Sequence, residues 1–185
     1  MIINIIHLPE RLDRWLTLQK ELEEQGITEY KIWDGIIDDG HNTTRAISRA
    51  HKQIIQFAKE IGLPEVMIAE DDVQFISPGA FNYFLENKPP DFDIYLASVY
   101  HGIIKEDSSV TDFSGLTLYI VKSKFYDQFL AVNENEDLDR ALKNKGKFII
   151  CNPFAAIQYN GYSDHLKKYC NYDWYLRERK LFGLN

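Results

Sequence analysis

Three consecutive carboxylates, Glu70, Asp71 and Asp72, follow a short apolar run in the stretch VMIAEDDVQF, residues 66–75. Neighbouring like charges repel one another, so the cluster needs a compensating charge. Side chains alternate faces in an extended stretch, which predicts that Glu70 and Asp72 point one way and Asp71 the other. Two carboxylates on one side make a hard-oxygen site for Mg²⁺ or Mn²⁺, and the cation could bridge to a diphosphate. The alternative is a solvated acidic turn after a strand.

Two arginines and a second acidic group are further candidates for this chemistry. Arg11 and Arg14 follow the first apolar run, where a guanidinium could grip a phosphate through two parallel hydrogen bonds. Their alternative role is on a helix surface, paired with nearby acids. Asp164 and His165 form an acid–imidazole pair that could complete a metal shell. The alternative for Asp164 is the N-cap of a last helix.

Hydrophobic periodicity predicts the elements that must position these residues. It predicts strands at residues 2–8, 30–33, 66–69, 93–100, 116–121 and 148–151, helices at residues 11–25, 44–61, 77–85, 124–132 and 137–144, and a loop at residues 34–42. This order favours an α/β fold with a mixed, mostly parallel sheet flanked by helices. Such sheets bind ligands at the carboxyl ends of their strands, where the acid triplet stands.

The composition limits the class of protein. A chain of 185 residues with 45% hydrophobic residues can bury a real core, which favours one domain over residues 1–185. The net charge of −7 argues against a nucleic-acid partner. The two cysteines, Cys151 and Cys170, have no metal-type spacing and make no disulfide framework, which favours a reduced, cytoplasmic setting.

Both ends of the chain bear on membrane contact. The apolar run at residues 2–8 is too short for a signal peptide or a spanning helix. Residues 165–183 mix aromatic side chains with Lys and Arg. This pattern is typical of a helix that lies on a membrane surface, here the inner face, or against an acceptor. The alternative is a segment that packs its aromatics on the core.

Several motifs recur in a fixed order along the chain. The stretch IHLPERLDR matches INLxxRxxR at Arg11 and Arg14, with His7 in place of the Asn. Later matches are Asp34-Gly35, Ala50-His51 for a Ser-His pair, Glu70-Asp71-Asp72 for an EDD triplet, Gly115 to Tyr119 for Gly-Thr-x-x-Tyr, Asp139 near a helix start, and Pro153, Gln158, Ser163 and Asp164 for a P…Q…SD ending. In order and spacing, over nearly the whole chain, this series resembles glycosyltransferase family 25, the lipooligosaccharide-biosynthesis glycosyltransferases.

The resemblance implies a GT-A-like nucleotide-diphospho-sugar transferase fold and a Mn²⁺ or Mg²⁺ cofactor. It also implies transfer of a hexose from a nucleotide sugar, with a UDP-sugar as the first expectation, to a glycan such as lipooligosaccharide or another surface polysaccharide. Together with the residue types above, it favours a metal on Asp72, Glu70 and His165, a donor against Arg11, Arg14, Asp34, His51 and Glu70, and catalysis at Asp139 and Asp71. Asp139 would be the general base.

Alternatives remain for single residues and for the whole chain. His51 falls on the apolar face of its helix, where a hydrogen-bonded core histidine is the common case, and Asp139 suits the positive end of a helix dipole. A metal-dependent phosphoesterase or nucleotidyltransferase would use the same carboxylates, and a degenerate glycosyltransferase-like module would bind without turnover. The sequence has no GxxxxGK[ST], GxGxxG, HExxH or GxSxG signature, so phosphate-loop, dinucleotide and common hydrolase chemistries are not supported.

Overall fold

The computed structural model describes residues 1–38, 40 and 42–184. Positions 39 and 41 of the predicted loop at residues 34–42 lie outside the described residues. The described part contains a seven-stranded sheet in the order β2-β1-β3-β9-β5-β10-β7. Its strands are β1 (Ile3–His7), β2 (Tyr30–Asp34), β3 (Glu65–Glu70), β5 (Ile94–Leu96), β7 (Ser109–Val110), β9 (Leu118–Lys122) and β10 (Phe148–Ile150).

The sheet is mixed and mostly parallel, as the sequence predicted. Strand β1 pairs in parallel with β2 and β3, and β5 pairs in parallel with β10. Strand β9 runs antiparallel between β3 and β5, and β7 is antiparallel to β10. The parallel strands β1, β2 and β3 therefore end at the same edge of the sheet, and the acid triplet begins at the last residue of β3.

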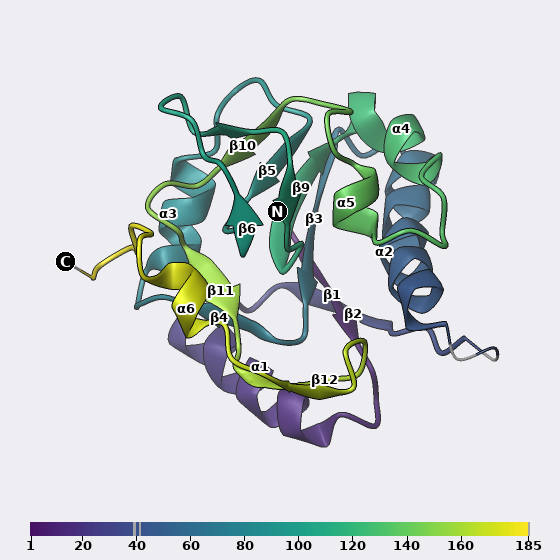
Figure 1. Ribbon diagram of the computed structural model, residues 1–185, viewed down its shortest axis with the longest axis horizontal. Helices are drawn as coiled ribbons and strands as arrows, with labels where there is room; N and C mark the ends of the chain where they lie inside the picture. The colour runs from purple at the N-terminus through teal and green to yellow at the C-terminus, as the bar shows by residue number, and fades with distance from the viewer. Residues whose placement is uncertain (39, 41, 185) are drawn as a thin grey trace.

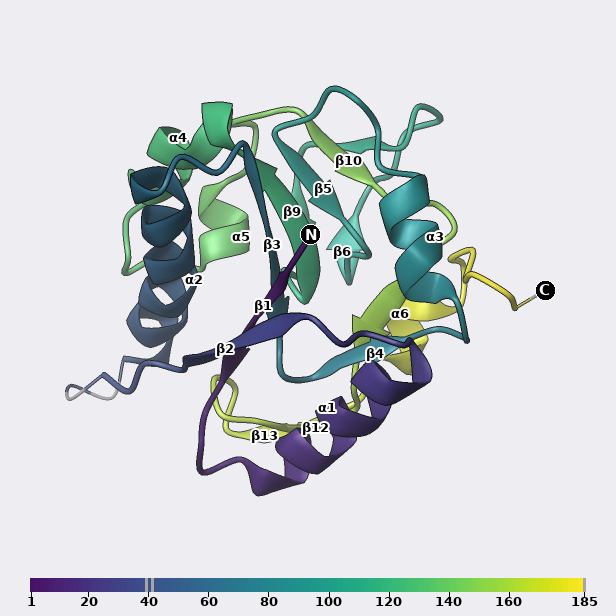
Figure 2. The ribbon, with the colours of Figure 1, turned by 180° about the vertical axis from the view of Figure 1, so that it is seen from behind.

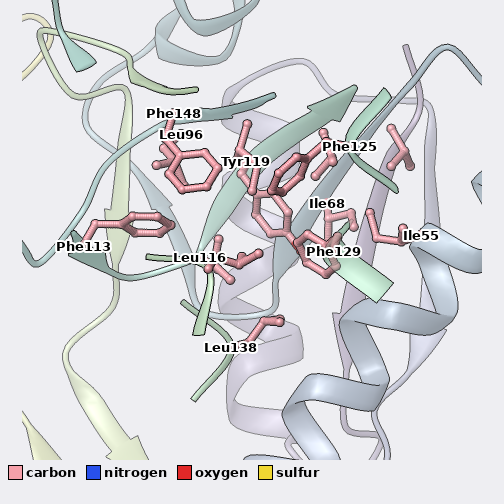
Figure 3. Close-up of a cluster of buried hydrophobic side chains, with 14 of the residues drawn as sticks. Ile55, Ile68, Leu96, Phe113, Leu116, Tyr119, Phe125, Phe129, Leu138 and Phe148 are labelled. Carbon is pink, nitrogen blue, oxygen red and sulfur yellow. The ribbon is translucent and has the colours of Figure 1, made fainter. Parts of the chain in front are cut away.

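Helices cover both faces of the sheet (Figures 1 and 2). They are α1 (Leu12–Glu24), α2 (Thr43–Glu60), α3 (Ala80–Glu86), α4 (Tyr126–Leu130), α5 (Leu138–Ala141) and α6 (Asp173–Leu176), with a 3₁₀ turn at Ser123–Phe125. The side chains of α2, α4 and α5 pack on one face, and those of α1 and α3 pack on the other. Figure 3 shows the first cluster, where Ile55 of α2, Phe129 of α4 and Leu138 of α5 surround Tyr119 and Ile68 of the sheet.

Helix α2 shows why the sequence folds as it does near the site. Its apolar positions recur at helical spacing, and Ala50, Ile54 and Ala58 are buried against the sheet. Asn42 caps the helix by accepting a hydrogen bond from the backbone N–H of Arg45 at 3.0 Å. The predicted helix at residues 44–61 is thus confirmed within one residue at each end, and its first half faces the carboxyl edge of the sheet.

Several predicted elements are shorter than their sequence patterns. The strand predicted at residues 93–100 is a strand only over Ile94–Leu96, and the helix predicted at residues 137–144 is the single turn Leu138–Ala141. The helix predicted at residues 77–85 begins at Ala80, because Gly79 has a left-handed φ of 84°. The helix predicted at residues 124–132 is a 3₁₀ turn followed by Tyr126–Leu130.

Three small two-stranded sheets complete the described structure. They pair β4 (Val73–Phe75) with β11 (Ala156–Gln158), β6 (His101–Gly102) with β8 (Phe113–Ser114), and β12 (Gly161–Ser163) with β13 (Lys168–Cys170). The β12–β13 hairpin lies along α1 in both views (Figures 1 and 2), and Arg11 and Arg14 both hydrogen-bond the carbonyl of Tyr162.

The C-terminal run is therefore not the helix that the sequence predicted as one alternative. Residues 165–183 contain strand β13 and the single-turn helix α6. Asn160 accepts a hydrogen bond from the backbone N–H of Tyr172, and Asn171 accepts one from that of Asp173. Such local side-chain bonds compete with helical ones and hold this segment in turns. No helix in the described residues combines the length and apolar character needed to cross a bilayer.

Candidate active site

A cleft of about 610 Å³ opens at the carboxyl edge of the parallel strands. Its volume falls in the range of small-molecule and cofactor sites. The cleft is lined by residues from the ends of β1 and β3, from α2 and α5, from β6 and β8, and from the C-terminal segment. It brings together eight of the candidate site residues, namely Arg14, His51, Glu70, Asp71, Asp72, Asp139, Asp164 and His165.

The acid triplet does not alternate as an extended strand would. Strand β3 ends at Glu70, and Asp71 and Asp72 form a turn. Asp71 and Asp72 consequently share one partner, since Arg14 Nη1 lies 2.7 Å from Asp71 Oδ1 and 3.0 Å from Asp72 Oδ2. The prediction that Asp71 points away from Asp72 is therefore wrong, because the turn replaces the pleat at this point.

Asp71 is buried and hydrogen-bonded through both of its oxygens. Its Oδ2 lies 2.8 Å from Nδ1 of His7, and its Oδ1 accepts the hydrogen bond from Arg14. The imidazole of His7 also packs against Trp15 of α1, with ring centroids 5.3 Å apart. Asp71 thus links the end of β1 to helix α1 and fixes the position of the Arg14 guanidinium.

Asp72 is equally buried but only partly paired. Its Oδ2 accepts a hydrogen bond from Gln158 Nε2 at 2.6 Å in addition to the contact with Arg14. Its Oδ1 is buried and has no hydrogen-bond partner among the described residues. Burial, together with the charge of Glu70, raises the pKa of Asp72 to about 7 against the opposing charge of Arg14. Asp72 therefore has one carboxylate oxygen in this cleft that a ligand could still bind.

Two successive hydrogen bonds connect Glu70 to a side chain in the core. Tyr119 Oη lies 2.7 Å from His51 Nδ1, and His51 Nε2 lies 3.1 Å from Glu70 Oε1. Both ring nitrogens of His51 are thus engaged, and burial raises the pKa of Tyr119 well above 10, which keeps its hydroxyl protonated. Burial opposes ionisation of Glu70, but the bond and charge of His51 outweigh it and lower the pKa of Glu70. His51 is therefore both a core histidine and a positioning residue.

A second series of hydrogen bonds connects Asp72 to residues that lie far away in the sequence. Tyr100 Oη lies 2.6 Å from Thr117 Oγ1 and donates to Oε1 of Gln158, whose amide nitrogen donates to Asp72. Tyr100 and His7 were not among the predicted site residues. One feature of the sequence could have indicated His7. It occupies the position where the resembling family has Asn, a residue that can also hydrogen-bond a carboxylate. No feature of the sequence indicated that Tyr100 belongs to the site.

Asp139 lies in the same cleft, on α5. Its Oδ2 accepts the backbone N–H of Gly115 at 2.8 Å, and its Oδ1 accepts the N–H of Arg140 at 2.7 Å. Gly115 has a φ of 113°, and a Cβ there would lie 3.1 Å from the ring of Tyr100. Burial raises the pKa of Asp139 although both backbone bonds oppose this. The predicted base therefore has a positioning role as well, because it holds the glycine turn against Tyr100.

Two predicted donor-binding residues lie outside this cleft. Asp34 is exposed at the end of β2 and is not among the residues that line the cleft. Arg11 lines a smaller neighbouring cavity of about 140 Å³ and pairs with Asp13 at 2.7 Å and with Asp164 at 2.5 Å. The predicted N-cap role of Asp164 is wrong, since no helix starts there and its carboxylate pairs with Arg11.

The predicted three-residue metal set is not formed. His165 lies 2.9 Å from Thr43 Oγ1 through Nδ1 and 3.6 Å from Asp137 through Nε2. Among the residues that the structure describes, no group of three or more His, Cys, Asp or Glu side chains is placed to hold a metal ion. The remaining pair, Asp72 and Glu70, fits a Mg²⁺ or Mn²⁺ ion that takes one or two carboxylates and completes its shell with substrate phosphates and water. The buried, unpartnered Oδ1 of Asp72 is the observation that supports this fit.

Comparisons with known proteins bear on the fold. No protein-family model and no curated protein sequence matches the chain. HddC from Yersinia pseudotuberculosis, complexed with GMP-PN, superposes with a TM-score of 0.56 over 90% of this chain and 97% of that chain, at 17% identity. A glycosyltransferase involved in the glycosylation of the major capsid of PBCV-1 superposes with a TM-score of 0.51 over 90% and 97% of the two chains, at 10% identity. These likenesses confirm the predicted GT-A-like fold.

Proposed function

We propose that this protein is a glycosyltransferase related to glycosyltransferase family 25, which moves a sugar from a nucleotide sugar to a glycan acceptor with the help of Mn²⁺ or Mg²⁺. A UDP-sugar is the first candidate donor, and lipooligosaccharide or another surface polysaccharide is the candidate acceptor. The observation that carries the proposal is the unpartnered, buried Oδ1 of Asp72 in a cleft at the carboxyl edge of a GT-A-like sheet.

The cleft offers different surroundings for the parts of such a donor. At the ends of β1 and β2 it is lined by Leu8, Gly35 and Ile36, which suit a nucleoside. Arg14 and Asp72 also line the cleft, and they suit a diphosphate that carries a cation. The guanidinium of Arg14 is aimed by Asp71 and remains partly accessible, with 21% of its side chain exposed.

Arg14 and Asp139 have separate roles in the proposed sugar transfer. A hydroxyl oxygen of the acceptor forms a bond to the anomeric carbon while the bond from that carbon to the diphosphate breaks. The bonding electrons leave with the nucleoside diphosphate, whose charge Arg14 helps to offset. The hydroxyl proton passes to a carboxylate, for which we propose Asp139, whose burial-raised pKa makes it a better proton acceptor than an exposed Asp.

A divalent cation bound by Asp72 and Glu70 would supply the remaining positive charge at the departing diphosphate. Asp71 is buried between His7 and Arg14, whereas Asp139 is partly exposed in the cleft, so we assign Asp71 to positioning Arg14 instead of the catalytic role that the resemblance implied.

The first experiment compares thermal shifts with UDP, GDP and CMP, each with and without Mn²⁺. A ligand that binds only the folded state raises the melting temperature. GDP belongs in the set because HddC was solved with GMP-PN. We expect one nucleotide to stabilise the protein in a Mn²⁺-dependent way, and the corresponding nucleotide sugars then to be hydrolysed slowly or transferred. The proposal is wrong if no nucleotide shifts the melting temperature.

One observation favours a second candidate, a module that binds a nucleotide without turnover. Arg14 already pairs with both Asp71 and Asp72, so an internal cation offsets part of the charge that a metal would offset. Such a module would show a nucleotide-dependent shift that needs no Mn²⁺, and no consumption of any nucleotide sugar. The two outcomes separate the candidates in a single series of measurements.

A further inference from the structure

Three tyrosines form one wall of the cleft, opposite α2 and α5. They are Tyr100, Tyr172 and Tyr175, called the aromatic wall below, and all three line the cleft. The rings of Tyr100 and Tyr172 stack with centroids 4.9 Å apart, and Tyr175 lies 6.2 Å from Tyr100. In Figure 1 the segment that carries Tyr172 and Tyr175, around α6, lies across the molecule from α5.

The aromatic wall is fixed although α6 has only one turn. The backbone N–H of Tyr172 donates to Asn160 Oδ1 at 2.7 Å, and Asn160 in turn donates to Asp173 at 2.8 Å. Arg179 donates to the carbonyl of Gly102 at 2.9 Å, which ties the end of this segment to β6. These bonds hold the rings in place before any ligand arrives, which lowers the entropy cost of binding.

The aromatic wall is connected to Asp72 by hydrogen bonds. Tyr100 hydrogen-bonds Gln158, and Gln158 hydrogen-bonds Asp72. Burial raises the pKa of both Tyr100 and Tyr172, and the nearby charges of Glu70 and Asp72 raise them further. Their hydroxyls therefore stay protonated, and the wall offers neutral aromatic faces with O–H groups at their edges.

We propose that the aromatic wall is the acceptor subsite, which binds a pyranose ring by stacking its C–H face on Tyr172 and Tyr175. The proposal deepens the proposed function and rests on it. A sugar ring is apolar on its C–H faces and polar at its rim, which matches aromatic side chains that carry polar edges. Ser163 comes from the same C-terminal segment and also lines the cleft.

A nucleobase also stacks on aromatic rings, but the position of the wall argues against it. In a nucleoside diphosphate sugar the base is separated from the anomeric carbon by a ribose and two phosphates, and in a CMP-sugar by a ribose and one phosphate. The acceptor hydroxyl, in contrast, must touch that carbon. Tyr100 is only one side chain away from Asp72, which we place at the diphosphate, so the wall adjoins the transferred sugar and the acceptor.

The test is saturation-transfer-difference NMR with the methyl pyranosides of glucose, galactose and mannose, in the presence of Mg²⁺ and of the nucleotide that gives the thermal shift. Wild type is compared with Tyr175→Leu and with Tyr169→Leu, a matched control because Tyr169 is 69% exposed on β13 and does not line the cleft. We expect at least one pyranoside to bind wild type and the control, and Tyr175→Leu to lose roughly fivefold in affinity for it.

Three results would overturn the inference without touching the proposed function. Equal sugar binding by Tyr175→Leu and Tyr169→Leu, or no binding of any pyranoside to wild type, removes the acceptor subsite from the wall. A loss of the nucleotide-dependent thermal shift in Tyr175→Leu reassigns the wall to the base. If wild type itself shows no nucleotide shift, the proposed function fails first.

Discussion

Asp71 and Asp72 are neighbours of the same residue type, and both are almost fully buried, yet their surroundings differ. Asp71 has a partner for each oxygen, His7 and Arg14. Asp72 shares Arg14, receives one bond from Gln158, and has one buried oxygen without a partner. Native proteins leave few buried polar atoms unpaired, so an exception beside a cleft indicates a function.

The difference separates the two roles that a buried carboxylate can have. Asp71 is paired as a structural ion pair would be, between Arg14 and His7. Asp72 has a pKa raised to about 7, so near neutral pH part of the population holds a proton where we propose that a cation binds. We therefore assign stability to Asp71 and ligand binding to Asp72, which can be tested by substitution.

The largest expected effect is a loss of stability in Asp71→Ala. The substitution leaves His7 and Arg14 without their shared partner in a buried region, which we expect to lower the free energy of unfolding by about 3 kcal/mol. Urea unfolding at pH 7.5 measures this. A change below about 0.5 kcal/mol, the size typical of surface sites, would show that Asp71 is not structural.

The second effect has the opposite sign, in Asp72→Asn. A carboxyl whose pKa is higher in the folded than in the unfolded state makes folding less stable as pH rises from about 4 to 7. Removing this charge should raise the free energy of unfolding at pH 8 by roughly 2 kcal/mol and change it little at pH 4. Urea unfolding at both pH values is the measurement, and destabilisation at pH 8 would contradict the assignment.

A smaller effect is expected from Gln158→Leu, which removes a donor from Asp72 and an acceptor from Tyr100. The loss of the donor raises the pKa of Asp72 further, since that hydrogen bond stabilises the anion. Mn²⁺-dependent nucleotide binding, followed by thermal shift against pH, should therefore need a higher pH than in wild type. An unchanged pH profile would show that Gln158 does not tune Asp72.

The smallest effect is expected from Asp34→Asn, the control for removal of a carboxylate. Asp34 is exposed and does not line the cleft, although the resemblance assigned it to the donor. We expect a stability change within about 0.5 kcal/mol and an unchanged nucleotide shift. A lost nucleotide shift would mean that the donor extends beyond the cleft as described here.

The sequence predicted the first half of the fold well and the second half less well. Strands β1, β2 and β3 and helices α1 and α2 have strong apolar periodicity, so local pattern alone sets their bounds. Strand β5 and helix α5 are shorter than predicted, because distant contacts decide where they end. Asp93, for example, accepts the backbone N–H of Lys147 through its side chain, a contact that no local pattern reveals.

The candidate site shows the same limit. The acid triplet, Arg14 and His51, which the sequence indicated by residue type, all line the cleft. Which carboxylate is paired depends on His7 and Gln158, which lie 64 positions before Asp71 and 86 positions after Asp72. The turn that begins after Glu70 also gives Asp71 an orientation other than the predicted one. Side chains alternate between the two faces of a sheet only as far as the strand continues.

The most direct test of the central assignment is Mn²⁺ binding followed by electron paramagnetic resonance at pH 8, with and without UDP or the nucleotide found by thermal shift. At this pH Asp72 is mostly ionised. We expect wild type and Asp34→Asn to bind Mn²⁺ in a nucleotide-dependent way, and Asp72→Asn to lose that binding while it remains folded. Equal Mn²⁺ binding by Asp72→Asn and wild type, or none by wild type, would contradict the account.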